Sequence, residues 1–226
     1  MLSNSLAHPI VEDSFMSRFL IADDHPLFRD ALAAALKRIN SAAEIEEASS
    51  LGDARQKLTP NLNLLLLDLH MSDSEGFAGL ITIRHQAPAL PVIVVSASEG
   101  DDVVRRAIEF GAAGYIPKSA SLDVICKAIS AVLEGDIWVP DDTDLNGGSG
   151  DDEVAQRIAT LTPAQLRVLM GLRAGRLNKQ IAYDMGITEA TVKAHVTAVF
   201  RKLEVINRTQ AVLAADVLDV DRPQVA

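Results

Sequence analysis

Four consecutive leucines, Leu64 to Leu67, are followed directly by Asp68, and this combination restricts the fold more than any other feature of the chain. An uninterrupted apolar run of this length is typical of a central strand in a parallel sheet, which is buried on both faces. Open parallel sheets hold their functional groups in the crevice at the carboxyl ends of the strands. Asp68 could also serve only as a helix cap or a turn residue, so its interpretation depends on the rest of the chain.

Three further segments share this arrangement, in which a short apolar run is followed by a polar side chain. Asp23 and Asp24 follow one such run, Ser96 closes another, and Lys118 follows a third. The segments between them are long enough for crossover helices, so the sequence predicts a (βα)5 doubly wound parallel sheet, an α/β fold, over residues 17–135. In a parallel sheet all of these polar groups would converge on one edge.

The paired carboxylates of Asp23 and Asp24 predict a divalent metal. Two neighbouring negative charges repel each other unless a cation neutralises them, and Mg²⁺ prefers oxygen ligands of this kind. Asp68 would complete the metal site, and its carboxylate could attack a phosphorus donor to become an aspartyl phosphate. Lys118 and Ser96 would then hold phosphoryl oxygens. A helix start after the two acids is an alternative that can coexist with the metal site.

These polar groups lie within four longer motifs, which are Ala22-Asp23-Asp24-His25-Pro26, Leu67-Asp68-Leu69-His70-Met71, Val95-Ser96-Ala97 and Gly111-Ala112-Ala113-Gly114-Tyr115-Ile116-Pro117-Lys118. With these motifs in this order, residues 17–135 resemble the receiver domain of two-component response regulators. The resemblance implies that a sensor histidine kinase phosphorylates Asp68, with Ser96 and Tyr115 as the switch residues. The Mg²⁺ ligands that it implies are Asp23, Asp24, Asp68 and the backbone carbonyl of His70. Ser72 stands where the family usually has proline.

The next segment has the composition of a flexible linker. Residues 136–157 are polar, acidic and glycine-rich, and their like charges should keep the segment extended. Residues 1–16 have no clear periodicity, which predicts disorder, and residues 221–226 would form a short tail. Met16 directly precedes the first predicted strand, so the native chain could start there.

No apolar stretch of the sequence is long enough for a membrane span. Its single cysteine permits no internal disulfide, which is typical of proteins in a reducing cytosol. We therefore expect a cytoplasmic protein without a membrane partner.

Residues 158–220 predict a small, all-α domain of four helices. Capping residues indicate where the helices start, and glycines indicate where they end. The first helix would start at the capping box Thr162 to Gln165 and end at Gly175. The second would start at Asn178 and end at Gly186, and Thr188 would cap the third. The third helix, over residues 189–203, follows the second after a short turn. This pair forms a helix-turn-helix whose second member would be the recognition helix.

The charge distribution supports a nucleic-acid partner for this domain. The chain carries a net charge of −10, but between Thr160 and Ala215 eight basic and three acidic side chains give +5, which leaves −15 elsewhere. A basic domain on an acidic body suits binding to the DNA phosphate backbone. The alternative is a solvated helical bundle whose basic residues only keep it soluble.

Five motifs of the predicted all-α domain are Leu161-Thr162-Pro163, Asn178-Lys179-Gln180-Ile181-Ala182, Gly186-Ile187-Thr188, Thr191-Val192-Lys193 and Arg201-Lys202-Leu203. With them, residues 158–220 resemble the LuxR-type helix-turn-helix of the NarL/FixJ group. The resemblance implies that Lys193, Ala194 and Thr197 face base edges in the major groove. The phosphate contacts that it implies are Lys179, Arg201 and Lys202. Gln165 replaces a typical glutamate, and Thr197 replaces a lysine of some members.

Together these features predict a phosphorylation-switched transcription regulator rather than an enzyme with a substrate of its own. We expect the unphosphorylated receiver to cover or misorient the DNA-binding helices, and the phosphorylated protein to form homodimers on double-stranded DNA. One alternative is a receiver that acts only through protein–protein contacts. Another is a phosphohydrolase of the haloacid-dehalogenase type, but those enzymes need a second aspartate where this chain has His70.

Overall fold

A computed structural model describes residues 17–145 and 150–220, and a parallel sheet of five strands lies at the centre of its N-terminal part. The sheet has the order β2-β1-β3-β6-β7. Its strands are β1 (Arg18–Ala22), β2 (Glu44–Ala48), β3 (Leu64–Asp68), β6 (Val92–Ser96) and β7 (Gly114–Pro117). A short antiparallel pair, β4 (His70–Met71) and β5 (Ser74–Glu75), follows β3. The doubly wound sheet predicted from the sequence is therefore confirmed.

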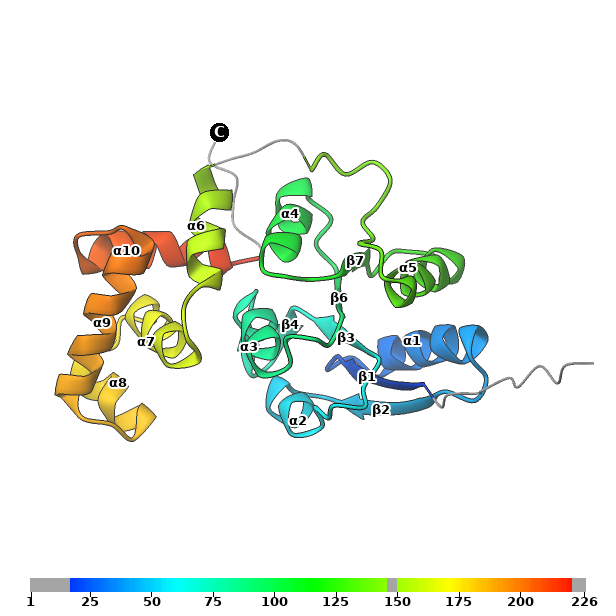
Figure 1. Ribbon diagram of the computed structural model, residues 1–226, viewed down its shortest axis with the longest axis horizontal. Coiled ribbons are helices and arrows are strands. Elements are labelled where there is room, and N and C mark those ends of the chain that lie inside the picture. The colour runs from blue at the N-terminus through cyan, green and yellow to red at the C-terminus, as the bar shows by residue number, and fades with distance from the viewer. Residues whose placement is uncertain (1–16, 146–149, 221–226) are drawn as a thin grey trace, which may run out of the picture.

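Helices cover both faces of this sheet (Figure 1). One face is covered by α1 (Pro26–Ile39) and α5 (Leu122–Glu134), and the other by α2 (Leu51–Gln56), α3 (Ala78–Gln86) and α4 (Asp101–Glu109). In β3, Leu64 and Leu66 pack toward the first pair, whereas Leu65 and Leu67 pack toward the other three helices. All four leucines are fully buried, and each burial stabilises the fold by about 1.5–3 kcal/mol.

The C-terminal part is entirely helical. Its helices are α6 (Gly150–Ala159), α7 (Pro163–Arg173), α8 (Asn178–Met185), α9 (Glu189–Leu203) and α10 (Arg208–Ala215), followed by the 3-10 helix η1 (Asp216–Leu218). The capping box is confirmed, because the Thr162 side chain accepts from the Gln165 amide and the Gln165 side chain accepts from the Thr162 amide. Thr188 also caps α9 as expected.

The cap predicted for α8 is wrong. Asn178 is the first residue of this helix rather than its cap, and Leu177 occupies the cap position. The Leu177 amide donates to Gln180 Oε1 at 2.7 Å. The glutamine side chain thus bonds the cap amide, while the apolar Leu177 has no side-chain oxygen with which to cap the helix.

The predicted linker over residues 136–157 differs from the structure at both ends. Trp138 still pairs with the receiver sheet, since its amide donates to Ala113 O at 3.1 Å and its carbonyl accepts from the Tyr115 amide at 3.0 Å. The segment from Gly150 onward belongs to α6, whose first turn contains three acidic residues. Negative charge interacts favourably with a helix N-terminus, so the acids that favoured an extended chain instead suit this helix.

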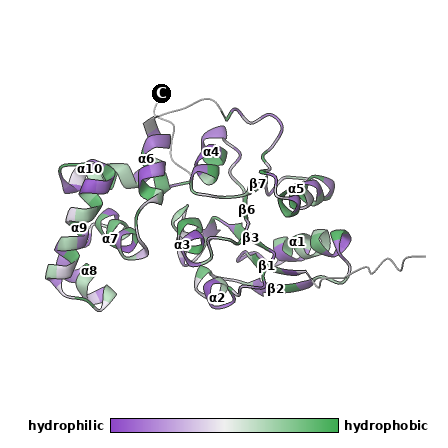
Figure 2. Ribbon diagram, viewed as in Figure 1, coloured by the Kyte–Doolittle hydropathy of each residue, from purple (hydrophilic) through white to green (hydrophobic). Residues whose placement is uncertain are grey.

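The two parts of the chain pack against each other. Helix α6 contacts α4, α7 contacts α3, and one hydrophobic cluster continues from the receiver sheet into the C-terminal helices. In Figure 2 the helices alternate between hydrophilic and hydrophobic residues, as amphipathic helices packed on one side do. Within residues 17–145 and 150–220, no helix is long and apolar enough to cross a membrane. The predictions for residues 1–16 and 221–226 lie outside the described residues.

Candidate phosphorylation and DNA-binding sites

Asp23, Asp68 and Lys118 meet at the carboxyl edge of the sheet. Lys118 Nζ lies 2.7 Å from Asp23 Oδ2 and 2.7 Å from Asp68 Oδ2. Both aspartates are buried, with 1% and 2% of their surface exposed. The Asp68 carboxylate also accepts a hydrogen bond from the His70 amide at 3.1 Å. The structure therefore brings together the strand-end groups of β1, β3 and β7 that the sequence singles out.

Burial and neighbouring charges shift the pKa values of Asp68 and Lys118 in opposite directions, and a different effect dominates at each residue. Burial raises the pKa of Asp68 more than the hydrogen bonds and the charge of Lys118 lower it, so the pKa of this carboxyl stays above its ordinary value. Burial also acts most strongly on Lys118 and would lower its pKa. The hydrogen bonds and charges of Asp23 and Asp68 together outweigh that effect, so the pKa of Lys118 is raised. The lysine therefore stays cationic beside two carboxylates.

The same edge has the composition of a site for a hard divalent cation. One ligand atom from each of Asp23, Asp24, His25 and Asp68 lies within 4.8 Å of all the others. Carboxylate oxygens predominate in this set, and Mg²⁺ prefers such ligands over imidazole nitrogen. The residues present fit the ion that the sequence predicts. The side chain of His25 is a neighbour that sequence reasoning did not include, with Nδ1 2.8 Å from Asp24 Oδ1.

Ser96 and Tyr115, the predicted switch residues, are both fully buried next to this site. Ser96 Oγ accepts from the Ser98 amide at 3.3 Å, and the Tyr115 hydroxyl donates to Ser98 O at 2.5 Å. Both side chains thus bind the backbone of one residue in the loop between β6 and α4. Burial raises the pKa of Tyr115 to about 12, so the phenol remains a hydrogen-bond donor at neutral pH.

A hollow lies beside Lys118 at this edge of the sheet. Its lining residues are His25, Leu27, Phe28, His70, Ala97, Ser98 and Lys118. Lys118 Nζ lies 5.0 Å from the centroid of the Phe28 ring, a cation–π distance. Leu27 is 85% exposed at the rim. The hollow therefore opens beside the lysine that bonds Asp68, with an apolar side chain at its rim.

Four of the predicted DNA contacts are exposed on α9. These are Lys193, Ala194, Thr197 and Arg201, and they recur at helical spacing on the side opposite the buried Val192, Val199 and Leu203. Lys179 is exposed on α8, the preceding helix of the helix-turn-helix. Lys202 instead donates through Nζ to Thr160 O at 2.6 Å. Its predicted role in phosphate contact therefore competes with a bond within the domain.

The exposed face of α9 corrects one expectation about regulation. The N-terminal domain contacts α6, α7 and residues 216–220, whereas Lys193 and Thr197 remain open to solvent. Among the described residues, none of the receiver covers this face of the recognition helix. Only the other half of the expectation is left, in which the receiver restricts how the DNA-binding domain is oriented.

Comparison with known proteins agrees with both halves of the chain. Residues 19–130 match the response regulator receiver domain, and residues 159–215 match the bacterial regulatory proteins of the luxR family. A relative named glycerol metabolism activator, from Pseudomonas putida, is 41% identical over 215 residues, which is 90% of this chain and 97% of the relative. The chain belongs to the LuxR-type response regulators. It is a transcription regulator with a receiver domain and a helix-turn-helix DNA-binding domain.

Other relatives of the regulator agree with this assignment. The transcriptional regulatory protein LnrK of Bacillus subtilis is 32% identical over 212 residues, covering 88% of this chain and 96% of LnrK. A structure of the response regulator RcsB from Salmonella typhimurium shares the fold, with a TM-score of 0.54, 21% identity, and coverage of 87% of this chain and 96% of RcsB. RcsB has also been solved as two dimers bound to two parallel DNAs, with a TM-score of 0.51 and 20% identity over 89% of this chain and 98% of that one.

One buried charged residue of the regulator was missed by sequence reasoning. Arg106 on α4 is only 3% exposed, and its guanidinium reaches the backbone carbonyls of Val217 and Asp219. A sequence signal existed, because Arg106 follows the apolar Val103 by three positions and so lies on the same side of an amphipathic helix. Alone, that position did not distinguish a buried arginine from one at the edge of the buried face.

Proposed function

We propose that Asp68 accepts a phosphoryl group from a sensor histidine kinase and that this reaction controls DNA binding by the C-terminal domain. The observation that carries the proposal is the position of the Asp68 carboxylate, which is buried, bonded to Lys118 at 2.7 Å, and grouped with Asp23 and Asp24. A structural ion pair would need only one carboxylate for one lysine. The excess negative charge favours a bound cation, and such a cation would in turn attract phosphoryl oxygens.

In the proposed reaction an Asp68 carboxylate oxygen attacks the phosphorus of the donor. The new O–P bond forms as the P–N bond to the kinase histidine breaks, and the histidine nitrogen keeps the electron pair and regains its neutral form. Mg²⁺ bound at Asp23, Asp24 and Asp68, and at the backbone carbonyl of His70, would neutralise charge on the phosphoryl oxygens. Lys118 would give up its bond to Asp68 and pair with a phosphoryl oxygen.

The switch would act through the loop between β6 and α4. The Ser96 hydroxyl can turn toward the phosphoryl group only by giving up the Ser98 amide, which it accepts at 3.3 Å. Tyr115 holds the carbonyl of the same residue, so a shift of the loop changes both bonds together. This loop leads directly into α4, so phosphorylation of Asp68 would change the position of α4 through the loop.

The output would be sequence-specific binding of double-stranded DNA. The exposed face of α9 supports this assignment, since Lys193, Ala194 and Thr197 are open to solvent on the predicted recognition helix. Lys179 and Arg201 would hold phosphates and fix the register. Phosphorylated dimers would read two half-sites about one helical turn apart or a multiple of it. We place this activity in the cytoplasm, where kinase and DNA are both accessible.

The activity would be that of a regulator whose only chemistry is at its own Asp68. Activation of transcription is favoured over repression by the name of the Pseudomonas putida relative, which is an activator. A reporter gene behind the chain's own target promoter, expressed with and without the regulator, tests the direction. Lower expression in the presence of the regulator would reverse it.

The test of phosphorylation is the intact mass of the protein after incubation with Mg²⁺ and a small phosphodonor. Wild type should gain one labile phosphate, and Asp68→Asn should gain none. Asp30→Asn is a matched control, because Asp30 is an exposed acid on α1 away from the strand ends, and it should behave as wild type does. Equal DNA affinity of wild type and Asp68→Asn under phosphorylating conditions would contradict the proposed control.

A further inference from the structure

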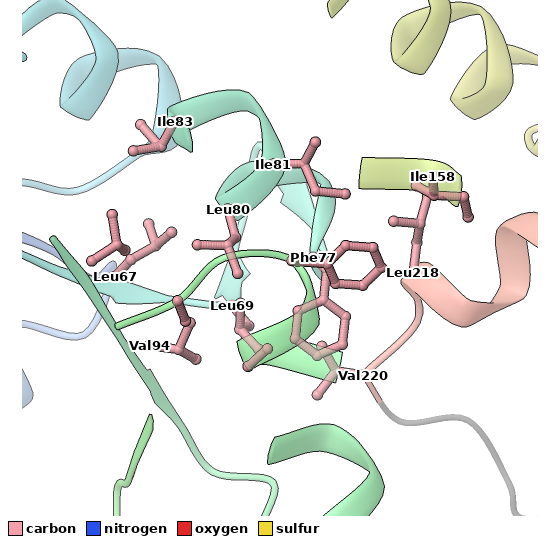
Figure 3. Packing of buried hydrophobic residues seen from close by; sticks show 14 of the residues in the cluster. Leu67, Leu69, Phe77, Leu80, Ile81, Ile83, Val94, Ile158, Leu218 and Val220 are labelled. Atoms are coloured by element: carbon pink, nitrogen blue, oxygen red, sulfur yellow. The ribbon is translucent and has the colours of Figure 1, made fainter. Parts of the chain in front are cut away.

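The last described residues of the chain run across the receiver rather than ending on the DNA-binding domain. Residues 216–220, called here the C-terminal segment, bury Val217, Leu218 and Val220 with 1%, 0% and 3% exposure. Figure 3 shows Leu218 and Val220 beside Phe77, in a cluster that also contains Leu69 and Leu80 from the receiver. The segment therefore fills an apolar surface of the receiver.

The backbone of this segment is also hydrogen-bonded to the receiver. Arg106 Nη1 donates to Val217 O at 2.9 Å and to Asp219 O at 2.6 Å. Between these two, the Phe77 amide donates to Leu218 O at 3.0 Å. Three consecutive carbonyls thus accept from receiver donors. Backbone bonds of this kind recognise the path of the chain and not only its apolar character.

Arg106 is suited to this task by its own surroundings. Its remaining nitrogens donate to Asp102, with Nη2 2.8 Å from Oδ2 and Nε 3.1 Å from O, and the guanidinium lies 5.4 Å from the centroid of the Phe77 ring. A buried guanidinium is costly unless its donors are matched by acceptors. Without the C-terminal segment, Nη1 would lose both carbonyls, so the buried arginine and the docked segment depend on each other.

The second bonding point requires glycine. Gly76 has a φ of +53°, and a Cβ atom added there would lie 2.0 Å from Leu218 O. No real contact is that short, so any side chain at this position would push the C-terminal segment away from the Phe77 amide. The close approach of two backbones thus explains why the turn before α3 contains glycine here.

We propose that the C-terminal segment, residues 216–220, is the element by which the receiver holds the DNA-binding domain in this arrangement. Its two attachment points are Arg106 on α4 and the Gly76–Phe77 turn. The occupant of the receiver surface is therefore this chain's own end, and control of DNA binding acts by holding the domain in place while the recognition face stays exposed.

Both attachment points lead back to the candidate phosphorylation site. The Gly76–Phe77 turn follows β3 through the β4–β5 pair, and Arg106 lies on α4, which follows the loop bonded by Ser96 and Tyr115. Release of the segment by phosphorylation rests on the proposed function. The docking itself does not, and the two can be tested separately.

The docking is tested on the full-length, unphosphorylated protein with two receiver variants. Arg106→Met removes the donors to Val217 and Asp219, and Gly76→Ala removes no buried group but displaces Leu218 O. Small-angle X-ray scattering should give a larger radius of gyration for both variants than for wild type, and hydrogen exchange at the Phe77 amide should lose its protection. DNA affinity should rise by about 10-fold, within the usual range for coupling between sites.

Two substitutions serve as matched controls. Gly135 also has a positive φ, of +99°, but an added Cβ would meet nothing within 4 Å, so Gly135→Ala should leave scattering and Phe77 exchange unchanged. Arg38→Met removes the same charge from the surface of α1, where Arg38 pairs with Asp123. If Arg106→Met fails to fold by circular dichroism, Gly76→Ala decides the result alone.

The outcomes separate the two proposals. Wild type that scatters as separated domains, or a folded Gly76→Ala that stays as compact and as protected as wild type, would overturn the docking proposal. Opening of the variants without any effect of a phosphodonor on wild type would support docking and refute the role of Asp68. Opening of wild type, but not of Asp68→Asn, after incubation with a phosphodonor would support both proposals.

Discussion

Replacement of Lys118 should destabilise the receiver, because this lysine neutralises the buried carboxylates of the candidate phosphorylation site. The Lys118 side chain is 17% exposed, and the side chains of its partners Asp23 and Asp68 are 1% and 0% exposed. In Lys118→Met, two buried carboxylates would face each other without a cation. Breaking a buried pair in this way costs about 3–5 kcal/mol, and we take about 3 kcal/mol because the lysine retains some contact with water.

The assay is thermal unfolding in EDTA and in Mg²⁺. At about 4 °C per kcal/mol for a domain of the size of residues 17–135, the unfolding temperature of the receiver in Lys118→Met should fall by about 12 °C in EDTA. Mg²⁺ at a hundredfold excess over its Kd adds about 2.7 kcal/mol, and it should restore more in the variant than in wild type, because it replaces the missing positive charge. Lys127→Met, at an exposed lysine of α5, should change stability by no more than about 0.5 kcal/mol.

A second substitution checks the cause. Adding Asp68→Asn to Lys118→Met removes one of the two repelling charges, so the double variant should be more stable in EDTA than Lys118→Met alone. The resulting coupling energy between the two sites should be about 1–3 kcal/mol. A loss below about 1 kcal/mol for Lys118→Met in EDTA, or a coupling near zero, would refute the argument that Lys118 neutralises Asp68.

Three further predictions concern other parts of the molecule. In Tyr183→Phe, which leaves Tyr115 as the one tyrosine, ultraviolet titration should place its ionisation at about pH 12. Stability should fall between pH 10 and that value, because the unfolded chain releases the proton first. In fluorescence-anisotropy titrations, Lys193→Ala should weaken binding to the target site by about 1–3 kcal/mol and relax its specificity, whereas Arg201→Ala should weaken binding to all sequences and reduce the salt slope by about one. Thr162→Ala should cost the DNA-binding domain about 1 kcal/mol in denaturant unfolding, through loss of the cap on α7.

Local signals in the sequence were sufficient for the sheet and for the chemistry at its edge. The leucine run before Asp68 has only one comfortable place in such a fold, a strand buried on both faces. Parallel strands bring their carboxyl ends to one edge, so strand order alone groups Asp23, Ser96 and Lys118 with Asp68. Helix caps such as Thr162 and Thr188 are also local, since a cap bonds to amides two or three residues away.

Composition was a poorer guide where a segment could take two structures. The acidic stretch after Trp138 has the composition of a linker, yet its second half begins α6, because the same acids suit a helix N-terminus. Asn178 is a good capping residue by type, but the Gln180 side chain bonds the cap amide of Leu177 instead. In both cases the residue type alone allowed two structures.

By itself, the sequence determined the two folds, and it grouped the residues of the proposed acceptor site and of the proposed DNA-binding face of α9, because each depends on residues close together in the chain or on strand order. Only the tertiary structure decided how the two domains are joined. Arg106 and the carbonyls of Val217 and Asp219 are separated by 111 and 113 positions in the chain, and backbone carbonyls have no signature in a sequence. Hydrogen bonds to such partners form only when the chain folds, which is why the sequence alone does not predict the link between α4 and the C-terminal segment.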